Sequence, residues 1–159
     1  MERIVNPEDC IFFIIAKANQ NTQRFWGSWI SKYNLTVVQA MIINFLSGND
    51  NISIKDLAEK VSIDNASMTG IIDRLVSSEL ITRQTDPQDR RSCLISLTVK
   101  GEEIAKQIHK DMITANKAYM SIFTKEEQKL FKDLLIRVRF NPLITRPENY
   151  LSREMQKNE

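Results

Sequence analysis

Between Asp64 and Asp73 the chain carries no charged side chain, and a helix there would present only small residues on its outward side. These residues are Asn65, Ala66, Ser67, Thr69 and Gly70. Small side chains let a helix backbone approach base edges, and Asn, Ser and Thr exchange hydrogen bonds with bases and phosphates. An ordinary surface helix usually carries Lys and Glu on its exposed side. The segment therefore favours a helix that reads the major groove of DNA.

A second feature is the pair Arg90 and Arg91, which follows a turn-forming segment between two strand-like stretches. Arginines at the tip of a hairpin can enter a narrow minor groove, whose negative potential attracts them. A solvated turn would also tolerate two adjacent arginines. Because Asp86 and Asp89 cancel the local charge, they either orient the arginines or argue against this interpretation.

The elements that must position these residues are mainly helical. Side chains able to cap a helix start predict helices over about 36–46, 53–60, 64–76, 98–123 and 124–139, after a first helix from about residue 7 to 33. The only convincing strand pair, 80–85 and 92–97, predicts a hairpin. Two short helices followed directly by a hairpin are the order of a winged helix-turn-helix module. The predicted fold class is mainly α with a small β-hairpin wing.

The composition fits one ordinary globular unit. The chain has 159 residues with 42% hydrophobic and 26% charged content, which excludes wholesale disorder. No apolar run approaches the roughly 20 residues of a membrane helix, and the acidic N-terminus does not fit a signal peptide, so we expect a soluble cytoplasmic protein without membrane contact. The net charge of +2 arises within residues 101–159, whereas residues 52–100 sum to zero. Bulk charge therefore gives no argument for a nucleic-acid partner.

The start of the first helix is apolar on every side. Cys10 is followed by Ile11-Phe12-Phe13-Ile14-Ile15-Ala16. A helix that is apolar all round must be buried all round, which a small domain rarely achieves alone. We therefore expect a partner subunit to cover it.

Several short motifs recur at characteristic spacing between Leu35 and about Ala105. They are Leu35-Thr36 with Gln39, Leu57-Ala58 with Val61, Ser67-Met68-Thr69, Ile72-Asp73-Arg74-Leu75, Leu80-Ile81-Thr82-Arg83, and Asp86-Pro87-Gln88-Asp89-Arg90-Arg91 followed by Leu97-Thr98 and Gly101. With these motifs the chain resembles the multiple antibiotic resistance regulator (MarR) family of transcription factors. The acidic double-arginine motif is specific at this spacing, and the resemblance extends to about residue 140.

The resemblance implies a homodimer that inserts two recognition helices into successive major grooves of a pseudo-palindromic operator, with the wings in the flanking minor grooves. It divides the chain into a dimerisation helix (7–34), a winged helix-turn-helix domain (35–98), C-terminal dimerisation helices (99–140) and a tail (141–159). We expect a repressor, on family habit, that is released by a small aromatic or phenolic effector. We expect no cofactor.

The resemblance also assigns roles to single residues. On the recognition helix, the residues expected to contact bases or phosphates, or to lie at the helix front, are Asn65, Ala66, Ser67, Thr69 and Arg74. In the wing, Arg90 would be the tip residue and Asp89 would brace it. Arg91 would form an ion pair with Asp64 that joins the wing to the recognition helix.

One position departs from the family pattern. Glu79 stands where the family usually has a glycine, just before the first wing strand. Glycine is the residue best suited to a left-handed helix end. We therefore expect a changed helix cap there, without loss of function.

A regulator of this family could respond to a small organic ligand, to an oxidant or to a metal ion, and each would require different residues. The aromatic group Trp26, Trp29, Tyr33 and Phe45 could line a ligand pocket, although aromatics at helical spacing more often form core. Cys10 lies where peroxide sensors of the family place a reactive cysteine, but the apolar residues after it favour an inert, buried thiol. A metal site is the weakest option, because His109 is the only histidine.

Two other classes of function have weaker support in the residues. An enzyme is not indicated, because the chain has no glycine-rich phosphate loop, no metal cluster and no nucleophile with a nearby histidine. A winged helix that binds another protein and no longer binds DNA is the stronger rival. Variants of Ser67 and Arg90 distinguish it from a DNA-binding regulator.

Overall fold

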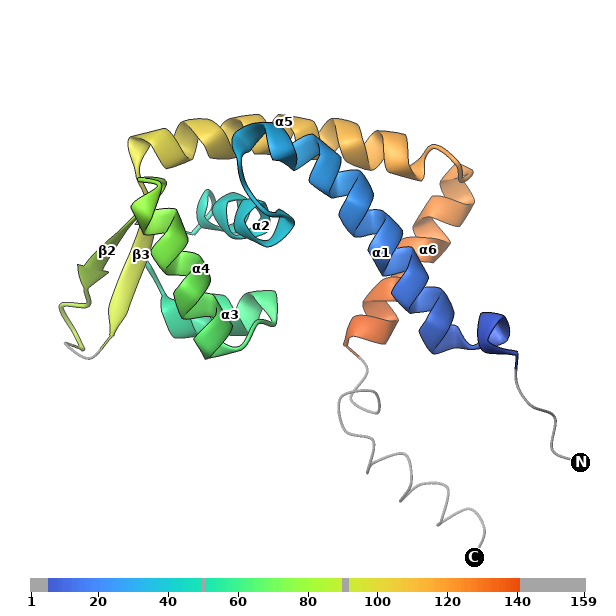
Figure 1. The fold of residues 1–159 in the computed structure, drawn as a ribbon, viewed down its shortest axis with the longest axis horizontal. Helices are drawn as coiled ribbons and strands as arrows, with labels where there is room; N and C mark the ends of the chain where they lie inside the picture. The colour runs from blue at the N-terminus through green and yellow to red at the C-terminus, as the bar shows by residue number, and fades with distance from the viewer. Residues whose placement is uncertain (1–5, 50, 90–91, 141–159) are drawn as a thin grey trace, which may run out of the picture. The chain divides into compact units, whose positions relative to one another are not determined.

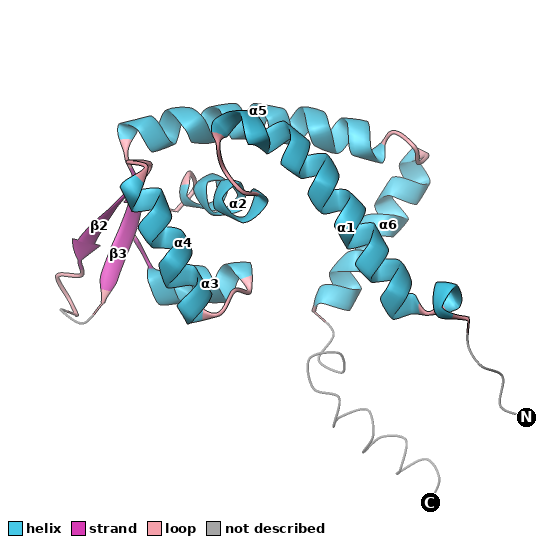
Figure 2. Ribbon diagram, in the orientation of Figure 1, coloured by secondary structure: helices cyan, strands magenta, loops and turns pink. Residues whose placement is uncertain are grey.

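The computed structural model describes residues 6–49, 51–89 and 92–140 (Figure 1). The helices are α1 (Ile11–Ile30), α2 (Val37–Leu46), α3 (Ile54–Val61), α4 (Asn65–Ser77), α5 (Val99–Met120) and α6 (Lys125–Arg139), with short 3-10 turns at Pro7–Asp9 and Ser31–Tyr33. The strands are β1 (Ile52–Ser53), β2 (Ile81–Thr85) and β3 (Cys93–Leu97). Figure 2 shows how small the sheet is beside the helices. The predicted class, mainly α with a hairpin wing, is confirmed.

The chain separates into two compact units, residues 1–115 and 116–159, so that the division falls inside α5. The first unit contains α1 to α4, the sheet and most of α5. The second contains the end of α5 and α6.

Four of the predicted helix starts are confirmed by their caps. Thr36 and Thr124 form complete capping boxes with Gln39 and Glu127. The side chains of Ser53 and Asp64 accept hydrogen bonds from backbone amides at the starts of α3 and α4. Each cap satisfies a backbone donor that the first turn of a helix leaves without a partner, which is why the sequence locates these starts well.

The first helix differs from the prediction at both ends. A short 3-10 turn precedes Cys10, whose extended backbone (φ −76°, ψ 121°) separates it from α1. The far end tightens into a second 3-10 turn that closes at Asn34, a residue in the left-handed region (φ 57°). The helix therefore spans Ile11–Ile30, and the apolar stretch lies at its very start.

The sheet has three antiparallel strands in the order β1-β3-β2. The predicted hairpin is confirmed, and in it Ile81 pairs with Leu97 and Thr85 with Cys93. Strand β1, in which Ile52 pairs with Ile95 of β3, has no signal in the sequence. A strand of two residues is too short to show an alternating pattern, and it exists only because β3 offers it a partner.

One continuous hydrophobic core holds the first unit together. Its fully buried side chains come from the end of α1, from α2, α3, α4, the sheet and α5, and the largest are Ile30, Ile42, Ile43, Leu46, Leu57, Met68, Ile72, Leu75, Ile95 and Ile108. Each of these elements presents one apolar face to the same centre. The opposite faces are left for the surface.

The end of α4 corrects the expectation at Glu79. Glu79 itself adopts the left-handed conformation (φ 59°). Its amide donates to the Val76 carbonyl at 2.9 Å, and the Leu80 amide donates to the Leu75 carbonyl at 3.0 Å. This is the hydrogen-bond pattern of a Schellman motif, with the buried Leu75 and Leu80 as its hydrophobic pair. The prediction of a changed cap was wrong, because the cap is ordinary and only its residue is unusual.

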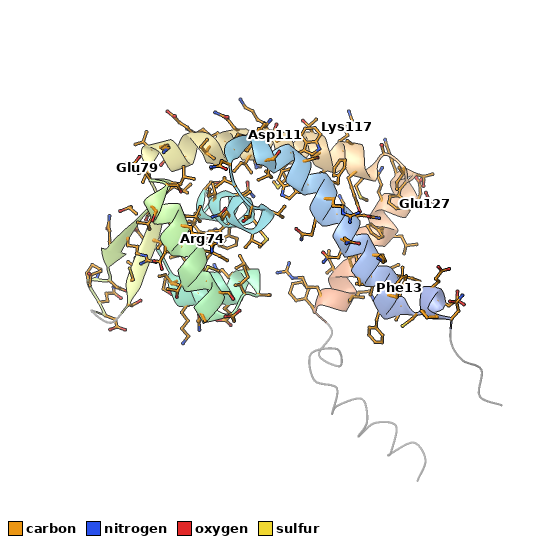
Figure 3. The ribbon with its side chains drawn as sticks, viewed as in Figure 1. Phe13, Arg74, Glu79, Asp111, Lys117 and Glu127 are labelled. Atoms are coloured by element: carbon orange, nitrogen blue, oxygen red, sulfur yellow. The ribbon has the colours of Figure 1, made fainter. Side chains whose placement is uncertain are left out.

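Both ends of the described chain expose large apolar side chains. In the first turns of α1, Phe12 is 79% exposed, and Ile11, Phe13, Ile14 and Ile15 are exposed as well. Figure 3 labels Phe13 near the start of this helix. On α6 the exposed apolar residues are Leu130, Leu134, Leu135, Ile136 and Val138. No helix in the described part of the chain is long and apolar enough to span a membrane.

Candidate nucleic-acid interface

The recognition helix α4 separates its residues cleanly between core and surface. Met68, Ile72 and Leu75 have no exposed surface at all and anchor α4 to the hydrophobic core. At its start, the Ser67 amide donates to Asp64 Oδ1 at 2.8 Å, and this bond is the first cause of the lowered pKa of the Asp64 carboxyl. The N-terminal half of α4 is therefore fixed in place, while its outward face remains open.

All of the predicted recognition residues lie on the exposed side. They are Asn65, Ala66, Ser67, Thr69 and Arg74. The Thr69 hydroxyl donates to the Asn65 carbonyl at 2.9 Å, so that Thr69 retains acceptor capacity and a methyl group for an outside partner. Arg74, labelled in Figure 3, makes no ion pair with another described residue.

Gly70 has no packing reason to be a glycine. A Cβ built at this position would meet no atom within 4 Å, and the backbone does not adopt a positive φ there. Glycine in a helix interior costs roughly 0.5–1 kcal/mol relative to alanine. An external surface that approaches the α4 backbone closely would explain why this cost is tolerated.

An ion pair joins the recognition helix to the wing. Arg83 on β2 donates from Nη2 to Asp73 Oδ1 on α4 at 2.6 Å. Asp73 is more than half exposed, and it lies on the outward side, beyond the uncharged stretch. Arg83 thus neutralises the acid that directly precedes Arg74 and also fixes β2 against α4. The sequence shows both residues, but a separation of ten residues across a helix end gives no local sign of pairing.

Hydrogen bonds to the Asp86 side chain and to the Asp89 backbone order the wing turn as far as the structure describes it. Asp86 Oδ1 accepts from the Gln88 amide at 2.8 Å, and the Asp89 carbonyl accepts from the Ser92 amide at 2.8 Å. Arg90 and Arg91 lie outside the described residues. The predicted tip contact of Arg90, its brace by Asp89 and the predicted pair of Asp64 with Arg91 stay predictions.

The base of the wing is sealed onto the first turn of α5. Thr98 donates from its amide to the Leu80 carbonyl at 3.1 Å and from its hydroxyl to the Glu79 carbonyl at 2.7 Å. A Cβ on Gly101 would lie 2.0 Å from the Leu80 carbonyl oxygen, so only glycine permits this approach. Figure 3 places Glu79 at this junction of α4, β2 and α5. These contacts tie the start of α5 to the end of α4 and to β2, the elements that carry the predicted DNA contacts.

Comparison with known proteins agrees with this geometry. The model of the MarR family matches residues 35–93, which run from before α2 into β3. The HTH-type transcriptional regulator FarR of Neisseria gonorrhoeae is 31% identical over 106 residues, which cover 67% of this chain and 73% of FarR. The chain belongs to the MarR family. It is a winged helix-turn-helix, DNA-binding transcriptional regulator, as the sequence motifs predict.

Solved structures of MarR-family regulators share the fold. A mutant MarR from Escherichia coli complexed with operator DNA has a TM-score of 0.79 and 25% identity, covering 86% of this chain and 99% of that one. The PcaV transcriptional regulator from Streptomyces coelicolor, in complex with its natural ligand, has a TM-score of 0.81 and 22% identity, covering 88% and 99%. The second likeness concerns the fold alone.

A charged cluster that sequence reasoning missed ties the end of α1 to α5. The Tyr33 hydroxyl donates to Asp111 Oδ2 at 2.5 Å, and Lys32 Nζ lies 2.7 Å from the same oxygen. The bond from Lys32, followed by that from Tyr33, holds the pKa of Asp111 below its usual value. Burial and the bond to Asp111 raise the pKa of Tyr33. Tyr33 and Asp111 are 78 residues apart, which is why no sequence pattern reveals the cluster.

The aromatic group predicted as a ligand pocket lies against the core of this MarR-family chain. Trp26, Tyr33 and Phe45 are half-buried and pack on the hydrophobic core, while Trp29 packs on Phe25 with ring centroids 6.4 Å apart. Two open cavities among the described residues, one beside α5 and one along α1, are lined by other side chains. The pocket stays a prediction, and these contacts favour a structural role.

Both cysteines are free thiols, and the described residues place neither them nor His109 in a metal-binding group. Cys10 is half-buried at the N-cap of α1, and Cys93 is half-buried in β3. His109 is exposed on α5. Within the described residues there is no group of three or more His, Cys, Asp or Glu side chains that could hold a metal ion.

Proposed function

We propose that the protein is a homodimeric repressor that binds a pseudo-palindromic operator and is released by a small effector. The observation that carries the proposal is the outward face of α4, which is small, uncharged and exposed around Ser67 and Gly70. Such a face fits between the walls of a major groove, where the helix backbone must come close to base edges. The operator DNA bound by the MarR mutant supports the same partner for this chain. Because that partner is DNA, we place the protein in the cytoplasm.

The proposed two-fold symmetric dimer is supported by the exposed apolar residues. A monomer that exposes Phe12 to 79% and a row of leucines on α6 lacks the contacts that would cover them. Exposed apolar patches of this kind mark interaction surfaces. A second copy supplies identical faces and doubles the DNA-reading elements, which matches an operator with two half-sites.

The effector part of the proposal draws on the natural ligand of PcaV. A ligand releases the repressor only if it binds more tightly to a conformation whose half-site spacing differs from that on DNA. We propose an organic ligand as the signal, rather than oxidation of Cys10, because the residues that directly follow Cys10 are apolar and offer its sulfur no polar partner.

The test is a fluorescence anisotropy titration of the full chain against the DNA upstream of its own gene, with scrambled DNA as competitor. We expect sequence-selective binding by the wild type. Ser67→Ala should weaken it about tenfold, since one lost base or phosphate contact costs roughly 1–3 kcal/mol. The matched control is Ser77→Ala on the last turn of the same helix, which should bind as the wild type does.

A second variant addresses the wing. Arg90→Ala should weaken binding and, if a phosphate contact is lost, reduce the salt dependence by about one unit of slope. The rival, a winged helix that binds only protein, requires that Ser67→Ala and Arg90→Ala leave its function intact. Absence of sequence-selective binding by the wild type would overturn the regulator proposal. In vitro transcription from the bound promoter then tests the direction, with repression as the expected result.

A further inference from the structure

We propose that Lys32, Tyr33 and Asp111 fix the angle between α1 and α5 and thereby set the spacing between the two recognition helices of the dimer. The Tyr33 hydroxyl donates to Asp111 Oδ2 at 2.5 Å, and Lys32 Nζ lies 2.7 Å from the same oxygen. We call these three residues the Asp111 cluster. All of them belong to the first compact unit. The inference rests on the proposed dimeric DNA-binding function and names positioning residues for it.

Asp111 interrupts an apolar stripe of α5. Ala105, Ile108 and Ala115 lie on the same face of the helix and are buried, and Asp111 stands between the last two with a side chain that is only 17% exposed. The other acids and lysines of α5 are exposed. A carboxylate in such a position loses hydration, and an apolar side chain of similar size often stabilises the site equally well or better. Stability alone therefore does not explain why an acid stands here.

The bonds of the Asp111 cluster are directional in a way that apolar packing is not. One carboxylate oxygen accepts from two neighbouring residues of the 3-10 turn Ser31–Tyr33, and Lys32 Nζ also lies 5.1 Å from the centroid of the Tyr33 ring. The oxygen can accept both bonds only while the turn keeps one orientation relative to α5. Partly buried polar pairs are best attested as devices that select one register between packed elements. We assign this role to Asp111.

The joint between α1 and α5 lies between the exposed apolar face and the DNA-reading elements. Within the described helix α1, Ile30 at its end is the one buried residue, whereas the first turns carry the apolar face that we assign to the dimer. The start of α5 is bonded to the end of α4 and to β2 through Thr98 and Gly101. The angle at the joint therefore decides where α4 lies relative to the dimer axis.

A small change of this angle has a large effect at the DNA. Because α1 has 20 residues, it is about 30 Å long, and a tilt of about 7° at one end moves the other end by about 3.5 Å. One base-pair step of DNA is about 3.4 Å. A dimer without the bonds of the Asp111 cluster should therefore accept half-sites whose spacing differs by one base pair from that of the natural operator.

The first measurement uses the full-length protein without DNA. In a background of Cys10→Ser and Cys93→Ser, a nitroxide label at Ser77→Cys on the exposed last turn of α4 reports the distance between the two copies by double electron–electron resonance. The test variant is Tyr33→Phe/Asp111→Leu, which replaces the polar bonds by apolar packing. Its distance distribution should be broader than that of the wild type or shifted by about 3 Å or more. An unchanged distribution would overturn the proposal.

The second measurement is the anisotropy titration with operators whose central spacer is one base pair longer or shorter. The wild type should prefer the natural spacing about tenfold, and the test variant should discriminate less than about threefold. A duplex with a single half-site reports on the recognition face alone, and both proteins should bind it equally. Weaker half-site binding by the test variant would show that the Asp111 cluster supports α4 itself and would overturn the positioning role.

Control variants separate positioning from charge and from stability. Lys32→Arg keeps a cation beside Asp111 and should retain the spacing preference of the wild type. Glu103→Gln on the exposed side of α5 removes the same charge and should retain it as well. Loss of the preference in Glu103→Gln would trace the effect to charge alone and overturn the proposal. Urea denaturation should show the test variant to be at least as stable as the wild type, and lower stability would assign Asp111 a merely structural role.

Failure of this inference is distinguishable from failure of the proposed function. A wild type that shows no distance between copies, or no sequence-selective DNA binding, would overturn the dimeric DNA-binding function and the spacing role with it. A dimeric, selective wild type whose test variant keeps the same distance distribution and spacing preference would overturn only the role of the Asp111 cluster.

Discussion

Apolar side chains are buried in the winged module, which comprises α2 to α4 and the sheet, but are exposed on two helical faces near the chain ends. These terminal faces are the first turns of α1 and the apolar side of α6. In the module, Ile42, Met68 and Ile95 reach zero exposure, because several elements converge on one centre. The first turns of α1 and the whole of α6 bury no side chain completely, and Phe12 is 79% exposed. The module is closed by contacts within the chain. No described residue of the chain covers the terminal faces, which a second copy would cover in a dimer.

This contrast explains what each region contributes. Burial of one large apolar side chain contributes roughly 1.5–3 kcal/mol. Covering the exposed apolar face of α6 would therefore contribute favourable free energy to subunit association. The module, being complete, can leave its outward face free of apolar residues and devote it to polar contacts. Stability of the module and association of the subunits are therefore separable, and variants can change one without the other.

The largest effect is expected when the apolar face of α1 is broken. Ile14→Glu should convert the dimer to a monomer and reduce operator affinity at least a hundredfold, because linked half-site binding contributes on the order of 10²–10⁴. Sedimentation velocity and anisotropy measure the two effects. Gln20→Glu, which adds the same charge on the exposed polar part of α1, is the control. A dimeric Ile14→Glu variant with normal DNA binding would show that this face is not the interface.

The next effect concerns the module alone. Gly101→Ala places a Cβ 2.0 Å from the Leu80 carbonyl oxygen and should lower the free energy of unfolding by about 3 kcal/mol. Urea denaturation followed by circular dichroism measures it. In Gly70→Ala the new methyl group meets open space, so stability should rise by roughly 0.5–1 kcal/mol. Equal stability losses in the two variants would contradict the distinction between the two glycines.

A smaller effect, about tenfold in operator affinity, is expected for Arg83→Gln. The variant releases β2 from α4 and leaves the Asp73 carboxylate uncompensated near the phosphates. Stability should change by less than about 1 kcal/mol, because the pair is exposed.

The double variant Asp73→Asn/Arg83→Gln separates the two causes. If positioning of the wing dominates, as we expect, the double variant still binds weakly in the anisotropy titration. Recovery of wild-type affinity would show that Arg83 only compensates the charge of Asp73.

The smallest effect is a pH-dependent one at the cluster of Lys32, Tyr33 and Asp111. The folded state lowers the pKa of Asp111, so its contribution is fully present above the unfolded value near 4 and is lost as the pH falls through the folded value. Asp111→Asn should cost about 1–2 kcal/mol at pH 7, and the difference from the wild type should shrink below about pH 4. Thermal melts across this range test the prediction. The exposed Asp133→Asn on α6 should show neither change.

Much of the fold could be predicted because its signals are local. The caps at Thr36, Ser53, Asp64 and Thr124 act over three residues, and the structure confirms each of them. The outward face of α4 also follows from helical spacing. Strand β1 could not be predicted, because its two residues carry no pattern and it depends on a neighbour in space.

The sequence by itself determined the small, uncharged outward face of α4, four of the helix starts and the hairpin, since these depend on patterns that are local in the sequence. Only the tertiary structure decided that Glu79 takes a left-handed conformation, because the buried pair of Leu75 and Leu80 closes the helix end more strongly than a non-glycine residue resists it. It also brought Asp73 to Arg83 and Tyr33 to Asp111. Such pairs depend on how elements that are distant in sequence pack against one another, which local sequence spacing does not indicate.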